Sequence, residues 1–183
     1  METITTESLN KLSLNSVASL LLFFTQRIYS QNVLKERVFF ENLFLKSWDC
    51  LFKKNTSNEL YDYFCIPLSE ITDNLEMRED TEKNIIQSIL YMFYYFIWTV
   101  DGIERFENPS KPFWGSVLGD IDDTFFFNAI EYALKSNCDS FKENIHLSVI
   151  FNYVSEIQNI DKVGLIGKAL TINDFNSQIF ESL

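Results

Sequence analysis

The segment 84–100 contains no charged side chain, and it limits the possible folds more than any other part of the chain. Apolar and aromatic residues cover nearly every side of a helix drawn through it, and such a helix is normally buried in a protein core. Thr81 is a suitable N-cap, and the Asp101-Gly102 pair is suited to ending a helix. We therefore expect a buried central helix over about 81–100.

The rest of the sequence predicts an all-α, single-domain protein over residues 1–183, a bundle of about six to eight helices around that central helix. Only 5 glycines and 3 prolines leave few tight turns, which favours long helices over many short strands. The residue before a proline avoids helical dihedrals, so a helix beginning at Glu59 should end before Pro67. Helical spacing of apolar residues predicts further helices over 8–30, 33–54, 59–65, 122–136, 139–159 and, at the end, 173–183. Residues 67–82 should form a loop or short helix, and 102–114, with two prolines, should be irregular.

The chain is strongly acidic, with 26 Asp and Glu against 15 Lys and Arg and a net charge of −11. Such a surface repels phosphate groups, so we expect neither nucleic acid nor an anionic membrane as partner. A basic protein would suit it, although acidity could also serve only to keep an aromatic-rich protein soluble. The charge-free segment is at the short limit for a bilayer span and has acidic flanks, which favours a core helix.

The cysteines and the first residues indicate a cytoplasmic protein. Cys50, Cys65 and Cys138 are odd in number and widely spaced, which is typical of reduced thiols and not of a disulfide framework or zinc site. The first fifteen residues lack a basic stretch followed by an apolar run, so we expect no signal peptide.

Three groups of residues are candidates for binding a partner. The acidic segment before the central helix contains one opposing charge, Arg78, and its candidate contacts are Glu70, Asp73, Glu76, Glu79 and Asp80. The second group is the run Asp120, Asp122 and Asp123, although acids at the start of a helix are also expected from the helix dipole alone. The third is the aromatic loop with Phe113 and Trp114, whose rings could contact a partner or fix the loop to the core.

No motif in the sequence indicates catalysis, a metal or a cofactor, and we expect a non-enzymatic protein that needs none. His146 is the only histidine, so a zinc site or a histidine base would lack companions. The run 120–123 could offer carboxylates to a divalent cation, but it lacks the spacing of a calcium-binding loop. The glycines at 164 and 167 lack the spacing and the preceding strand of a phosphate-binding loop.

Three stretches carry a resemblance to a known family. They are 20–29 (LLLFFTQRIY), 48–52 (WDCLF) and 67–75 (PLSEITDNL), the last standing before the apolar central segment. Over about residues 10–100 this layout resembles the YjaG-like family, small all-helical bacterial proteins of unassigned function. The resemblance implies an all-α fold and no catalytic residue.

Three functions fit these observations. The first is an immunity-type inhibitor that neutralises a basic toxin through protein–protein contact with an acidic face. The second is a regulatory helical protein that binds a small ligand in an aromatic pocket. The third is an enzyme that uses scattered carboxylates and a metal. In each case an aromatic-rich bundle could also bury spare surface in a homodimer.

Overall fold

The computed structural model describes residues 5–30, 34–112 and 120–136, and within these ranges it contains helices and no strand. The predicted all-α class is therefore confirmed for this part of the chain. In order, the elements are α1 (Thr6–Leu9), α2 (Leu14–Ser30), α3 (Arg37–Leu51), α4 (Ser57–Thr72), the 3₁₀ helix η1 (Leu75–Met77), α5 (Asp80–Glu107) and α7 (Asp123–Lys135).

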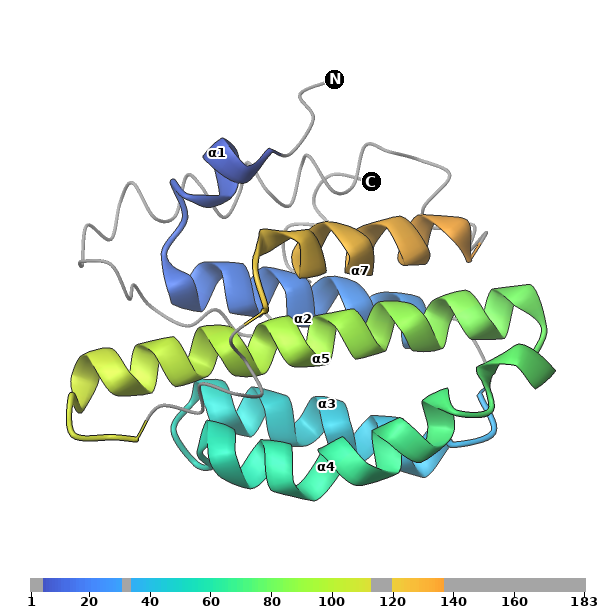
Figure 1. Cartoon of the computed structure of the whole chain (residues 1–183), viewed down its shortest axis with the longest axis horizontal. Coiled ribbons are helices and arrows are strands. Elements are labelled where there is room, and N and C mark those ends of the chain that lie inside the picture. The colour runs from blue at the N-terminus through green and yellow to red at the C-terminus, as the bar shows by residue number, and fades with distance from the viewer. Residues whose placement is uncertain (1–4, 31–33, 113–119, 137–183) are drawn as a thin grey trace, which may run out of the picture.

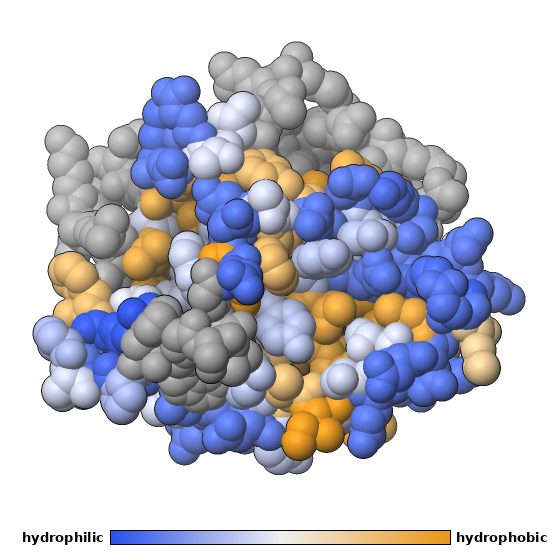
Figure 2. All heavy atoms as spheres, viewed as in Figure 1, coloured by the Kyte–Doolittle hydropathy of each residue, from blue (hydrophilic) through white to orange (hydrophobic). Residues whose placement is uncertain are grey.

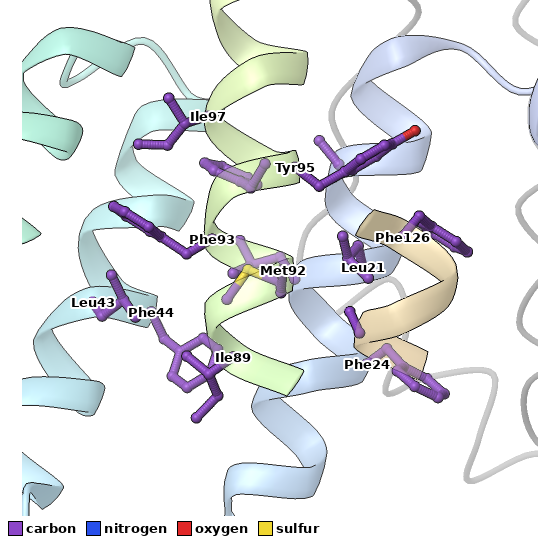
Figure 3. Close-up of a cluster of buried hydrophobic side chains, with 14 of the residues drawn as sticks. Leu21, Phe24, Leu43, Phe44, Ile89, Met92, Phe93, Tyr95, Ile97 and Phe126 are labelled. Carbon is purple, nitrogen blue, oxygen red and sulfur yellow. The ribbon is translucent and has the colours of Figure 1, made fainter. Parts of the chain in front are cut away.

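The helix α5 packs against α2, α4 and α7, while α3 packs against α2 and α4 (Figure 1). Side chains from α2, α3, α5 and α7 meet in one hydrophobic core (Figure 3). Large rings from three of these helices, Phe44, Phe93 and Phe126, are fully buried there. None of the helices in the described ranges is long and apolar enough to cross a membrane.

The charge-free helix begins close to the predicted residue 81, but its predicted N-cap and its predicted end were wrong. α5 begins at Asp80, with Glu79 and not Thr81 as its N-cap, and it continues through Asp101 and Gly102 to Glu107. The Asp101 side chain does not end the helix because it pairs with Arg105, one turn further along the same helix. The extension carries charged groups of α5 toward the start of α4.

The predicted end of the helix before Pro67 was also wrong, because α4 continues through this proline to Thr72. A proline inside a helix removes the hydrogen bond to the carbonyl four residues earlier, here that of Tyr63. The Tyr63 side chain is exposed, so water can reach this side of the helix. At its start, α4 is held by a capping box in which Thr56 and Glu59 each bond to the other's backbone N–H.

The other observed helix limits agree with the predicted limits to different degrees. The predicted helix 8–30 is divided into α1 and α2, and the Ser13 hydroxyl accepts a hydrogen bond from the N–H of Ser16 at the start of α2. The helix predicted over 33–54 is shorter in the structure, where α3 spans Arg37–Leu51. The helix expected from residue 122 or 123 is confirmed as α7, with Asp122 as its N-cap. The helices predicted over 139–159 and 173–183, together with His146 and Cys138, lie outside the described residues.

Candidate functional site

The one basic residue of the acidic segment, Arg78, is taken up by an ion-pair network inside the molecule. Its Nη2 atom lies 2.5 Å from Oε1 of Glu36, and its Nη1 atom lies 2.6 Å from Oε1 of Glu82. The hydrogen bonds from Arg78 lower the pKa of Glu36, and those to Glu36 raise the pKa of Arg78. The guanidinium therefore does not neutralise the exposed carboxylates around it.

The exposed carboxylates of this segment gather where α4 passes through η1 into α5. We call this surface the acidic face, and it consists of Glu70, Asp73, Glu76, Glu79 and Asp80. Among the described residues, Glu76 has an ion pair, 2.7 Å from Lys83, and the other four have none. Figure 2 shows hydrophilic residues gathered at this end of the molecule, on the right of the view. The structure thus brings together the first of the three predicted groups.

An exposed apolar side chain belongs to the same segment as the acidic face. Met77, in η1, is 89% exposed, the highest exposure among the large hydrophobic residues of the described chain. An exposed, flexible thioether in an acidic segment is suited to contact with an amphipathic surface, because methionine adapts to irregular neighbours. Met77 was not among the predicted contacts, because its place between Glu76 and Arg78 does not indicate its exposure.

The run at 120–123 lies apart from the acidic face, and two of its acids have structural roles. The Asp122 carboxylate accepts a hydrogen bond from the N–H of Thr124, 2.9 Å away, and its pKa is lowered by its bonds to Thr124. Asp123 accepts a 3.1 Å hydrogen bond from the hydroxyl of Tyr95, whose pKa is raised by burial and by this carboxylate. Tyr95 stands fifteen residues along α5 from Asp80, or roughly 22 Å at the rise of a helix.

One of the three remaining candidate contacts lies in the described part of the chain, and two lie outside it. Asp120 is exposed. Phe113 and Trp114 lie outside the described residues. Within those residues no group of three or more His, Cys, Asp or Glu side chains is arranged to hold a metal ion.

A buried polar cluster at the other end of α5 was not predicted. Asp101 is 1% exposed, and its two carboxylate oxygens lie 2.7 Å from Arg105 Nε and 2.6 Å from Lys111 Nζ. Lys111 also pairs with Glu104, and Glu104 accepts hydrogen bonds from the backbone N–H and the hydroxyl of Ser57 at the start of α4. No pattern in the sequence indicates this cluster, because its members come from three separate segments.

The same cluster places a serine beside a lysine, an arrangement that some hydrolases use for catalysis. The Lys111 ammonium donates a 2.8 Å hydrogen bond to Ser57 Oγ. A catalytic lysine must be neutral to accept the serine proton. Burial acts to lower the pKa of Lys111, but hydrogen bonds to Asp101 and Glu104 outweigh it and raise the pKa, so the lysine stays charged. The cluster is thus suited to joining segments of the fold and not to activating Ser57.

Comparisons with protein-family models, curated proteins and solved structures found no match to this chain. The resemblance of residues 10–100 to the YjaG-like family therefore stays a prediction.

Proposed function

We propose that this chain is a non-enzymatic binding protein whose acidic face captures a basic protein, as an immunity-type inhibitor captures a toxin. The observation that carries the proposal is that Arg78 is paired within the molecule while neighbouring carboxylates stay exposed. Glu36 and Glu82 hold its guanidinium, while Glu70, Asp73, Glu79 and Asp80 remain exposed without an ion pair among the described residues. A concentrated negative surface of this kind accelerates encounter with a basic partner and selects against acidic ones.

Further features support the same proposal. The net charge of −11 adds a long-range attraction to the local one. Met77, in the segment that carries the acidic face, offers an exposed apolar contact that a partner could desolvate. We place this binding protein in the cytoplasm, and we infer that the full chain forms a single bundle of six to eight helices around α5.

The test compares two charge-reversed variants of equal net charge. The face variant carries Glu70→Lys, Asp73→Lys, Glu79→Lys and Asp80→Lys. The matched control variant reverses four exposed carboxylates elsewhere: Glu7, Glu41, Asp62 and Glu131. Three of these have exposed ion pairs, which contribute little to stability, so both variants should fold.

Immobilised wild type and both variants would be exposed to lysate of the source cells at low salt and washed with rising salt. We expect a basic protein bound by the wild type and the control, released by salt, and lost on the face variant. Added wild type should suppress the activity or toxicity of the purified partner. The proposal would be overturned if the wild type retained no basic protein, or if the face variant retained as much of it as the control variant.

A further inference from the structure

The exposed methionine of η1 is open to chemical modification. The sequence has three methionines, of which the structure describes Met77 and Met92. Met77 is 89% exposed, whereas Met92 is 0% exposed and belongs to the hydrophobic core (Figure 3). A thioether sulfur reacts with a dissolved oxidant only where the oxidant can reach it, so the fold gives these two chemically identical side chains different reactivity.

The backbone of η1 is held in place although the Met77 side chain is exposed. The Met77 N–H donates a 3.2 Å hydrogen bond to the Asn74 carbonyl, and the Arg78 N–H donates a 3.0 Å hydrogen bond to the Leu75 carbonyl. The Leu75 side chain is buried and belongs to the core. Reaction at the Met77 sulfur therefore needs no opening of the fold, whereas reaction at Met92 requires the core to open.

The charges next to Met77 in the chain favour an uncharged oxidant. Four exposed carboxylates lie within four residues of it: Asp73, Glu76, Glu79 and Asp80. Of these, Glu76 pairs with Lys83, and Arg78, the one basic residue in this range, is itself paired with other carboxylates. Consecutive Cα atoms are about 3.8 Å apart, so the backbone of Glu76 and of Glu79 is within about 8 Å of Met77, which is one Debye length at physiological salt. An anion is repelled at this distance, while a neutral molecule is not.

We propose that Met77 is an oxidation site, at which hydrogen peroxide, an uncharged oxidant, converts the thioether to a sulfoxide in the folded protein. A lone pair of the sulfur attacks one peroxide oxygen, and the S–O bond forms as the O–O bond breaks. The proton of the attacked oxygen passes to the other oxygen, which leaves as water. Sulfur is oxidised by two electrons and the peroxide is reduced by two. The product has a polar oxygen where the surface had an apolar group, and this reaction is independent of any protein partner.

Peptide mapping by mass spectrometry, after treatment of the full chain with hydrogen peroxide, tests the proposal. Trypsin separates the two methionines, because residues 55–78 and residues 84–105 each lie between consecutive cleavage sites. In native buffer Met77 should gain one oxygen at least about tenfold faster than Met92, which reacts only when the core opens. In urea, which exposes both sulfurs, the two rates should become equal.

Two controls assign the reaction to Met77. Cys65 lies in the same tryptic peptide, and Met77→Leu keeps an apolar side chain without sulfur, so oxygen gained by this variant belongs to the cysteine. The oxygen gain of the wild type should be lost in the variant. Thermal unfolding of the chain oxidised at Met77 should match that of the untreated chain, because changes to exposed side chains have little effect on stability.

The charge of the oxidant tests the role of the carboxylates. Periodate is an anion that also oxidises thioethers, and it should react with Met77 about threefold faster or more in the face variant than in the control variant of equal net charge. Hydrogen peroxide is neutral and should react equally fast with Met77 in both. If Met77 reacts no faster than Met92 in the native chain, the oxidation site is refuted. If periodate reacts equally fast with both variants, the preference for an uncharged oxidant is refuted.

Discussion

The ammonium nitrogen of Lys111 lies 2.6 Å from a carboxylate oxygen of Asp101, and both side chains are largely withdrawn from water. Lys111 stands in the segment after α5, while Asp101 lies inside that helix. Lys111 also donates to Ser57 at the start of α4. One buried ion pair therefore connects α5, the segment that follows it and the first residue of α4.

Replacing Lys111 with methionine should strongly destabilise the fold. The change keeps most of the side-chain volume but leaves Asp101 buried with Arg105 as its one remaining charged partner among the described residues. Breaking a buried pair by removing one partner costs about 3 kcal/mol or more, because the other charge stays desolvated. Urea unfolding measures this loss. The control Lys135→Met breaks an exposed pair with Glu131 and should cost less than about 0.5 kcal/mol, so equal losses would argue against a buried network.

The same substitution at two prolines should have opposite effects. Pro67→Ala restores a backbone N–H inside α4 and should stabilise the protein by about 1–3 kcal/mol. Pro109 occupies the second position of a turn closed by a hydrogen bond from the Lys111 N–H to the Asn108 carbonyl, where proline is favoured. Pro109→Ala should therefore destabilise by about 0.4–1 kcal/mol. Thermal unfolding of both variants would show the contrast, and a loss of stability at Pro67 would contradict it.

The sequence predicted the elements whose signals are local. The periodic apolar residues of α5 and the start of α7 near residues 122 and 123 follow from patterns within one helix, and both agree with the structure. It failed at Pro67, where α4 continues with an exposed side, and at Asp101-Gly102, where Asp101 pairs with Arg105 and with Lys111. The exposure of Tyr63, or a lysine ten residues away from Asp101, cannot be inferred from a pattern within one turn.

The candidate site was predictable to a similar degree. The cluster of acids at 70–80 was visible in the sequence, because one segment contains all of them. That Arg78 does not neutralise these acids was not visible, because its partner Glu36 is 42 residues away. The separation of the acidic face from the run at 120–123 likewise depends on where α7 packs along α5.

Cys50 should be nearly inert toward thiol reagents in the native protein. It is buried, and burial raises its pKa from 9.0 to about 12. At about pH 8 this shift alone reduces the reactive thiolate roughly a thousandfold. In a variant with Cys65→Ser and Cys138→Ser, labelling by a disulfide reagent should become fast when urea unfolds the chain. Fast labelling without denaturant would mean that the core around Cys50 opens readily.

The ion pair between Glu36 and Arg78 should make stability depend on pH. The pKa of Glu36 is lowered from its ordinary value of 4.5, chiefly by its hydrogen bonds with Arg78. A carboxylate whose pKa is lower in the folded state takes up a proton more readily on unfolding. Its contribution is therefore complete above the unfolded-state pKa and is lost as pH falls through the folded-state pKa.

Urea unfolding from about pH 7 to about pH 3 tests this dependence. Below about pH 4.5, the free energy of unfolding of the wild type should fall more steeply with decreasing pH than that of Glu36→Gln, which cannot bind the extra proton. Other carboxylates titrate in both proteins, so the difference between the two curves isolates Glu36. In an Arg78→Met background the cause of the pKa shift is gone, and adding Glu36→Gln should no longer change the slope. If the slopes of wild type and Glu36→Gln coincide, the ion pair does not contribute to the stability of the fold, and Arg78 is free to neutralise the acidic face.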